Sequence, residues 1–262
     1  MTDTNTNNAD TDDQDDTSSI VAATGGASNL FYFVLPAPEL ERSKAFYSKL
    51  FGWKIEGGSL GGHISNVTPA GGLLPGSAPD QRSVFITVDD VEVSAAKVVE
   101  LGGRVDGEVQ TAEPGTWVSC RDNQGTQFHL QDPKGGAHAD YARNPQPGRG
   151  HGDLFYFSLP VADGEIGRRF YSEVFGWDLG EPGSAGGMNA RNVTIEGGIG
   201  AGREGDHVEL WFRVDDIDAA VNTVAELGGE TSEVFDTPQG LIAQCVDDQG
   251  VEFGLAQPAP GF

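Results

Sequence analysis

The sequence is poor in cysteine, in basic residues and in long apolar runs. Two Cys among 262 residues are too few for the disulfide framework of a small secreted domain. Lys and Arg total 16 against 40 Asp and Glu, so the chain lacks the basic surface that neutralises nucleic-acid phosphates. No apolar run approaches the roughly 18 residues of a membrane span, and the N-terminus has no apolar signal segment. We therefore expect a cytoplasmic protein with neither a nucleic-acid nor a membrane partner.

The negative charge is large and spread along the chain. The formal net charge is −24, and the first 27 residues supply only six of the acidic side chains. Dense surface carboxylates keep a protein hydrated and soluble. A Lys-poor, acidic composition of this kind is typical of salt-accumulating organisms, so we expect a halophilic protein. An ordinary acidic protein is the alternative.

The most informative feature is a long internal repeat. Six short landmarks recur at offsets of 124 to 126 residues, a period too long for a solenoid of short repeats. The landmarks are FYF at 31 and 155, FY at 46 and 170, FGW at 51 and 175, VDD at 88 and 214, LGG at 101 and 227, and QG at 124 and 249. Cys120 and Cys245 are also equivalent, and we expect both to be small buried strand residues. The repeat therefore indicates a duplicated domain.

Composition divides the chain into four parts. Residues 1–27 are Asp, Thr, Asn, Ser and Gly with little to bury, which predicts a disordered acidic tail. The Gly- and Pro-rich segment 133–152 reads as a linker. It separates a first domain at 28–132 from a second at 153–258.

Within each copy, the apolar spacing predicts a strand, a helix and three strands, twice over. The first helix should end at Gly52, and the second should be capped by Asp89 or Asp90. The same order fits 154–179 and 208–257. The elements expected in the first copy are helix 39–51, a helix from Val91 to Leu101, and strands 30–35, 53–57, 62–67, 70–74, 84–88, 105–110, 115–121 and 126–131.

These motifs together resemble the vicinal oxygen chelate superfamily. The resemblance rests on a strand ending Leu-Pro, a helix with Phe-Tyr and Phe-Gly-Trp, Val-Asp-Asp before a second helix, Leu-Gly-Gly, and a late Asp-x-Gln-Gly turn. The superfamily includes glyoxalase I, bleomycin-resistance proteins, extradiol dioxygenases and fosfomycin-resistance enzymes. It implies an α+β fold of two tandem glyoxalase-like domains, each with two βαβββ units in a curved, open barrel around a cleft. The two-domain layout most resembles glyoxalase-like proteins of actinobacteria, often described as hydroxylases or secreted antigens.

The resemblance also implies where a metal would lie. Superfamily enzymes hold a divalent metal with His, Glu or Gln so that it chelates two adjacent substrate oxygens. Each copy here offers one good ligand, His129 or Glu209, where three or four are needed. We therefore expect no cofactor, with His129, His207 and Glu209 as the candidates for a nonstandard metal site. The equivalent positions are Tyr32, Ser83 and His129 in the first copy and Tyr156, Glu209 and Gly254 in the second.

Strand alternation predicts the remaining cleft residues. Tyr32 and Tyr156 could instead simply pack, and His129 could be a hydrogen-bonded histidine with no ligand. Glu209 could be solvated or paired with Arg213, four residues along the same strand. The position of His63 is occupied by Met188 in the second copy, which argues against a shared ligand role and leaves open a site used by the first copy alone. The cleft candidates are Tyr32, Ser83, Phe85, Gln127 and His129, and then Tyr156, Glu209, Trp211 and Arg213.

The predicted function is the binding of a small oxygenated molecule in one or both clefts, without the complete metal site. One alternative is a metal-dependent lyase of the glyoxalase I type, or a dioxygenase, with nonstandard ligands. Another is an interaction module without a ligand, which filled clefts would favour. We expect a monomer or a homodimer, because the duplication already joins two domains in one chain.

Overall fold

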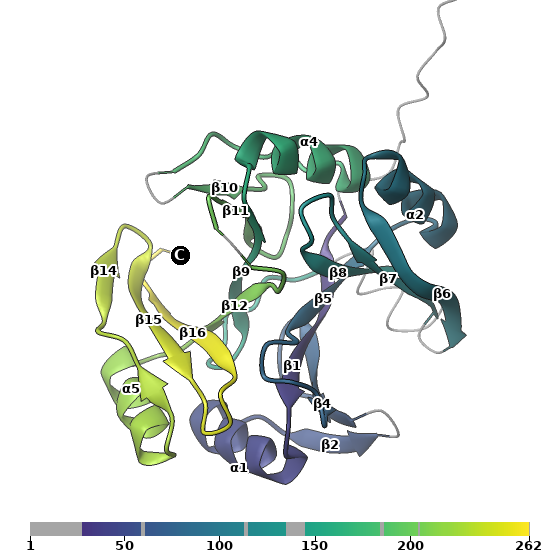
Figure 1. Ribbon diagram of the computed structural model, residues 1–262. Helices are drawn as coiled ribbons and strands as arrows, with labels where there is room; N and C mark the ends of the chain where they lie inside the picture. The colour runs from purple at the N-terminus through teal and green to yellow at the C-terminus, as the bar shows by residue number, and fades with distance from the viewer. Residues whose placement is uncertain are drawn as a thin grey trace, which may run out of the picture.

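In the computed structural model, each half of the chain forms its own eight-stranded sheet (Figure 1). The structure describes residues 28–58, 61–112, 115–134, 145–183, 186–203 and 205–261. The predicted tail and half of the predicted linker, residues 135–144, lie outside these residues. The predicted fold class is confirmed: two tandem α+β domains with open, mixed sheets.

The first half follows the predicted order closely. Its strands run β2-β3-β4-β1-β5-β8-β7-β6 across the sheet, with β1 antiparallel to β5 and β5 parallel to β8. The elements are β1 (Leu30–Ala37), α1 (Leu40–Phe51), β2 (Ile55–Gly58), β3 (Gly61–Ile64), β4 (Ala70–Pro75), β5 (Ser83–Thr87), α2 (Val91–Glu100), β6 (Arg104–Ala112), β7 (Gly115–Arg121) and β8 (Gln127–Pro133).

The second half repeats this plan with shorter strands toward the edges of its sheet. Where the first half has strand β2, the second has only an isolated bridge between Leu179 and Ala190. The sheet order is β10-β11-β9-β12-β16-β15-β13, with β14 beside β15. The elements are β9 (Leu154–Val161), α4 (Gly164–Phe175), β10 (Gly187–Asn189), β11 (Gly197–Ala201), β12 (Glu209–Arg213), α5 (Ile217–Glu226), β13 (Glu230–Thr231), β14 (Phe235–Thr237), β15 (Gly240–Val246) and β16 (Glu252–Pro258).

The repeated landmarks set the helix ends. Gly52 and Gly176 follow α1 and α4 in the left-handed conformation, at φ 69° and 66°, which glycine adopts without a Cβ penalty. Asp90 caps α2 by accepting a hydrogen bond from the Val93 amide, and Asp216 does the same for α5. The predicted helix stops and the Asp90 cap are therefore confirmed.

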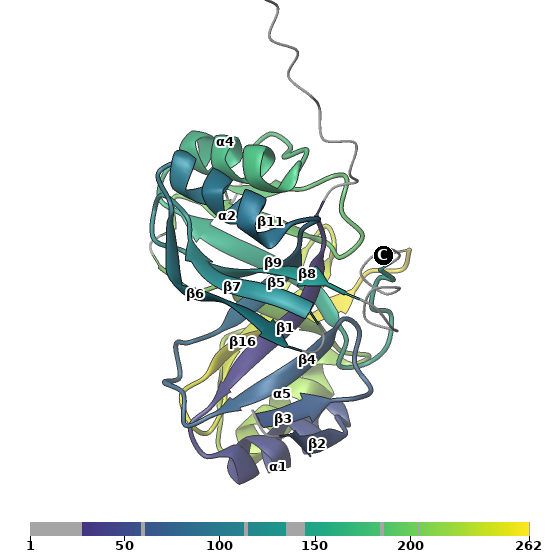
Figure 2. The ribbon, with the colours of Figure 1, turned by 90° about the vertical axis from the view of Figure 1, so that its right-hand side faces the viewer.

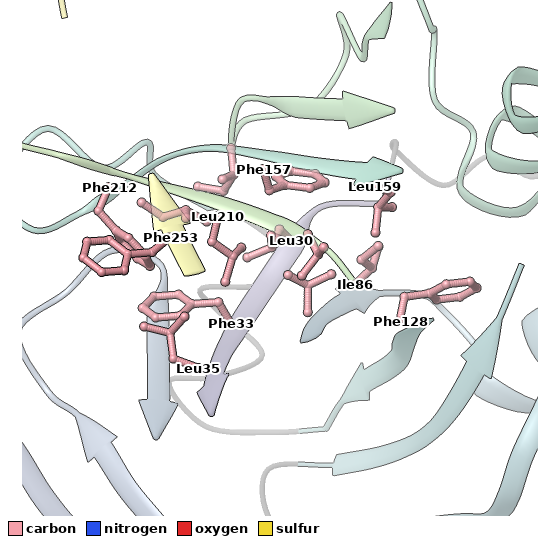
Figure 3. Packing of buried hydrophobic residues seen from close by; sticks show 14 of the residues in the cluster. Leu30, Phe33, Leu35, Ile86, Phe128, Phe157, Leu159, Leu210, Phe212 and Phe253 are labelled. Atoms are coloured by element: carbon pink, nitrogen blue, oxygen red, sulfur yellow. The ribbon is translucent and has the colours of Figure 1, made fainter. Parts of the chain in front are cut away.

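The two halves share one hydrophobic core rather than two separate ones. Buried apolar side chains from both sheets form a single cluster, with the Phe33 and Phe212 rings 5.2 Å apart across the halves (Figure 3). Helix α1 packs beside α5, and α2 beside α4, so each helix pair draws one member from each half (Figure 2). Burial of the core therefore depends on both halves together.

Pairs of equivalent hydrogen bonds tie the halves together about a pseudo-twofold axis. The buried Tyr47 hydroxyl donates to Asp247 at 3.0 Å, and Tyr171 donates to Asp122 at 2.9 Å. Both aspartates begin the Asp-x-Gln-Gly turns. The glutamine of each turn also binds the other half. The Gln249 side-chain oxygen accepts a hydrogen bond from the Glu39 amide, and that of Gln124 accepts one from the Asp163 amide. The recurring motifs therefore build the interface between the halves as well as the helix ends.

The structure also bears on the two cysteines and on the expected absence of a membrane span. Cys120 and Cys245 are both free and buried, as predicted for small strand residues. Among the described residues, no helix is long and apolar enough to cross a membrane.

Candidate ligand cleft

The concave face of each sheet is built by its three central strands. In the first half, strand pairing places Tyr32 opposite Phe85, and Phe85 beside His129. In the second half, Trp211 lies between Tyr156 and Gly254 in the same way. In each half, three side chains therefore lie side by side across the central strands, and the two faces differ in what fills them.

In the first half, aromatic rings cover this face. Phe85 stacks on His129 with ring centroids 4.3 Å apart, and Trp117 meets both rings edge-on at 5.7 and 5.8 Å. Tyr32 lies parallel to His63 at 6.0 Å, with its hydroxyl 3.3 Å from Nδ1. Burial raises the pKa of the Tyr32 phenol to about 12. The face is thus a packed layer of rings.

The His129 imidazole is fully engaged within this layer. Its Nδ1 lies 2.8 Å from Ser119 Oγ and its Nε2 lies 3.1 Å from Ser83 Oγ. Burial lowers its pKa to about 4, so the ring is neutral near pH 7. Gln127 is engaged as well, because its side-chain oxygen accepts a hydrogen bond from Arg121. These polar groups hold one another rather than facing an open site.

In the second half, the same face borders a cavity of about 420 Å³. Cavities that bind small molecules commonly measure about 300 to 1,000 Å³. Of the predicted candidates, Glu209 and Trp211 border this cavity directly. Its other lining residues come from β12, from β13 and the residue after it, from β15 and β16, and from one position of the first half: Arg82, Leu210, Glu230, Thr231, Ser232, Gln244, Cys245, Val246, Glu252, Phe253 and Gly254.

The cavity exists partly because of a glycine. A Cβ at Gly254 would overlap three atoms of the Trp211 indole, so the ring can lie against the β16 backbone only because residue 254 has no side chain. The equivalent residue of the first half is His129, whose ring stacks on Phe85. At this position, therefore, an imidazole ring covers the sheet of the first half, whereas the Trp211 indole lies directly on the backbone of the second half.

The polar groups beside Trp211 form two pairs. Glu209 makes an ion pair with Arg203 from the segment after β11, not with Arg213. Tyr156 donates to the Asn189 side chain at 2.7 Å, and burial, followed by the nearby Glu209 charge, raises its pKa to about 12. Glu209 is thus fixed at the cavity wall, with its charge partly compensated.

The first half contributes a buried arginine to this cavity. Arg82 is 8% exposed and donates from Nε to the Val208 carbonyl at 3.0 Å. Its other nitrogens reach the Glu252 carbonyl and the Glu252 carboxylate at 3.4 and 3.2 Å. Sequence reasoning missed this residue, because the strand pattern of one copy carries no information about the other. The second cleft is therefore a composite of both halves.

Two predicted candidates lie elsewhere. Arg213 borders a separate cavity of about 60 Å³ together with Phe155 and Glu196. His207 precedes β12 and contacts the neighbouring Asp206 carboxylate. The structure thus brings Glu209 and Trp211 together with Tyr156, and places these two away from them.

The side chains present do not fit the metal centre that the superfamily resemblance implies. Among residues 28–261 that the structure describes, no three His, Cys, Asp or Glu side chains come together to hold a metal ion. In the first half, both nitrogens of His129 contact serine hydroxyls. In the second half, Gly254 has no donor atom and Glu209 is bound to Arg203.

Two relatives match this chain along most of their length. The Mycobacterium tuberculosis protein named "Putative glyoxylase CFP32" is 27% identical over 252 residues, which cover 86% of this chain and 93% of that protein. The anthracycline biosynthesis protein DnrV of Streptomyces peucetius is 26% identical over 277 residues, which cover 88% and 94%.

Solved structures show the same fold. An extradiol ring-cleaving dioxygenase from B. fuscum matches with a TM-score of 0.63 at 15% identity, over 90% of this chain and 74% of that one. The Mn(II)-bound glyoxalase from Novosphingobium aromaticivorans matches with a TM-score of 0.61 at 13% identity, over 88% and 82%. At these identities the likeness concerns the fold alone.

The family assignment follows from the sequence match to each half. The Glyoxalase-like domain family matches residues 32–131 and again residues 157–256. These segments contain the central strands and both helices of each sheet. The chain is therefore a member of the glyoxalase-like family, within the vicinal oxygen chelate superfamily, and carries two copies of the domain.

Proposed function

We propose that this protein binds a small oxygenated organic molecule in the cleft of its second half, without the complete metal site of the superfamily's enzymes. The observation that carries the proposal is the cavity of about 420 Å³ beside Trp211 and Glu209. It combines an aromatic surface with a few fixed polar groups, as small-molecule sites do. An open cavity of this size counts against a module without a ligand.

The first half has a layer of packed rings where the second half has a cavity, and this contrast supports different roles for the two halves. The ring layer around His129 and Phe85 gives the first half a rigid face, and Arg82 extends from this half to the other cleft. The first half would then support the binding site of the second. The names of two relatives, CFP32 and DnrV, refer to a glyoxylase and to anthracycline biosynthesis, and both concern small organic molecules.

The proposal can be tested by blocking the cleft. Gln244 lines the cavity from β15 and is exposed, so Gln244→Trp should fill it with little cost in stability. Gln239→Trp places the same side chain at an exposed residue outside the cavity lining. A library of small oxygenated compounds should give binders, by ligand-observed NMR, that Gln244→Trp abolishes and Gln239→Trp retains.

Two results would contradict this function. Binders that Gln244→Trp leaves unaffected would place the site elsewhere. One tightly held transition metal per purified chain would favour the alternative of a lyase or dioxygenase with nonstandard ligands. In that case His129→Gln and Glu209→Gln should be compared for the loss of metal.

A further inference from the structure

We infer that the ligand of the second cleft is an organic cation, namely an amine attached to a planar apolar body. This inference rests on the proposed function and adds the chemical class of the ligand. It follows from the charges at the cavity wall and from the position of one indole ring.

Carboxylates dominate the charged groups of the wall. Glu209, Glu230 and Glu252 line the cavity, and Arg82 is its one charged residue of opposite sign among the described lining residues. Glu209 is paired with Arg203 and Glu252 with Arg82. Glu230 makes no ion pair with a described residue and is exposed. One carboxylate at the wall therefore has no cationic partner within the part of the chain that the structure describes.

The hydrogen-bonding groups have the same bias. The Arg82 guanidinium already donates to the Val208 carbonyl and to both the carbonyl and the carboxylate of Glu252. An anionic ligand beside Arg82 would therefore also approach the Glu252 carboxylate. An ammonium group, in contrast, can donate to the Glu230 carboxylate and to the amide oxygen of Gln244, because both residues line the same cavity.

Trp211 provides the surface for the apolar part of the ligand. One side of its indole rests on the backbone at Gly254, while the side chain also borders the cavity. Aromatic faces attract cations through the ring quadrupole, and they stack with planar groups. The net charge of −24 adds a long-range attraction for cations in dilute salt.

Three probes with one ring system test this inference: tryptamine as the cation, tryptophol as the neutral alcohol and indole-3-acetate as the anion. Titration calorimetry at about 0.15 M salt should show tryptamine binding roughly tenfold more tightly than tryptophol, and indole-3-acetate more weakly than both. The preference should shrink at about 1 M salt, because screening is stronger.

A matched pair of variants locates the preference. Glu230→Gln should weaken tryptamine binding about three- to tenfold and leave tryptophol unchanged, whereas Glu226→Gln, exposed on α5 and outside the cavity lining, should change neither. Indole-3-acetate binding most tightly, or no binding of any probe, would overturn the inference. The function proposed above would still be judged separately, by the library screen with Gln244→Trp.

Discussion

Tyr47 donates its hydroxyl hydrogen to Asp247, a residue 200 positions further along the chain, over 3.0 Å. The other oxygen of the Asp247 carboxylate accepts from the amides of Gln249 and Val251 in its own turn. One buried carboxylate thus holds a turn of the second half and a helix of the first. Tyr171 and Asp122 form the equivalent pair.

The first prediction concerns this pair. Tyr47→Phe should lower the free energy of unfolding by about 1 to 3 kcal/mol, because it leaves a buried carboxylate oxygen without its donor. Tyr171→Phe should cost a similar amount. Tyr156→Phe removes a hydroxyl from a more exposed hydrogen bond and should cost less. Urea denaturation measures all three, and an unchanged Tyr47→Phe midpoint would contradict the role of the pair.

A second prediction concerns the pH dependence of the same carboxylate. Burial raises the pKa of Asp247 above its ordinary value of 3.8. The folded state therefore binds this proton more readily than the unfolded state does, so the contribution of Asp247 is largest below about pH 4 and is lost as pH rises through the raised pKa. The stability of Asp247→Asn relative to wild type should therefore improve between pH 4 and 7, as measured by urea denaturation. A difference that does not change with pH would contradict this reasoning.

His129 should show the opposite dependence. Its folded pKa of about 4 lies below the ordinary value of 6.5, so the unfolded state gains the proton first as pH falls. The resulting loss of stability between pH 6.5 and 4 should be on the order of 3 kcal/mol. His129→Gln should flatten this part of the urea-denaturation profile. An equally steep profile in the variant would show that other groups control it.

The fourth prediction concerns the glycine beneath the indole. Gly254→Ala should displace the Trp211 ring, because the added Cβ would overlap it, and should weaken the binding of cleft ligands at least tenfold. Gly57→Ala, at a position with open space around it, is the matched control and should bind normally. NMR of the indole N–H groups would report the displacement. Retained affinity in Gly254→Ala would exclude the proposed Trp211 surface.

The fifth prediction concerns the arginine that crosses between the halves. Arg82→Gln should lower the free energy of unfolding by about 1.5 to 3 kcal/mol, because a buried charged group loses hydrogen bonds to Val208 and Glu252. Arg104→Gln removes an exposed arginine paired with Asp106 and should cost less than about 1 kcal/mol. Similar costs for both variants would mean that Arg82 is not a structural link.

The elements of the fold could be predicted from the sequence because their signals are local. Gly52 ends a helix, Asp90 caps one, and strand alternation placed Tyr32 and His129 on one face. Partners between distant segments could not be predicted. One alternative for Glu209 was a pair with Arg213 on its own strand, but it pairs with Arg203, whose position depends on how the chain turns after β11.

The ring layer of the first cleft shows the same limit. Ser119 and Trp117 contact His129 from the neighbouring strand β7, and the register of that pairing decides which side chains meet. The sequence contains both residues at alternating positions, which is a signal that they share a face. The distance between the strands cannot be predicted from the sequence, and this distance allows a serine hydroxyl to contact each imidazole nitrogen of His129.

The pairing of helices across the halves has an evolutionary consequence. Two identical subunits joined in this way would carry the same residue at the positions of His129 and Gly254, so a His-to-Gly change that opened one cleft would open both. Once the two copies are encoded in tandem, each can mutate independently while the Tyr–Asp contacts keep them assembled. Covalent fusion thus permits one site to be lost or remodelled without loss of the partner that supports it.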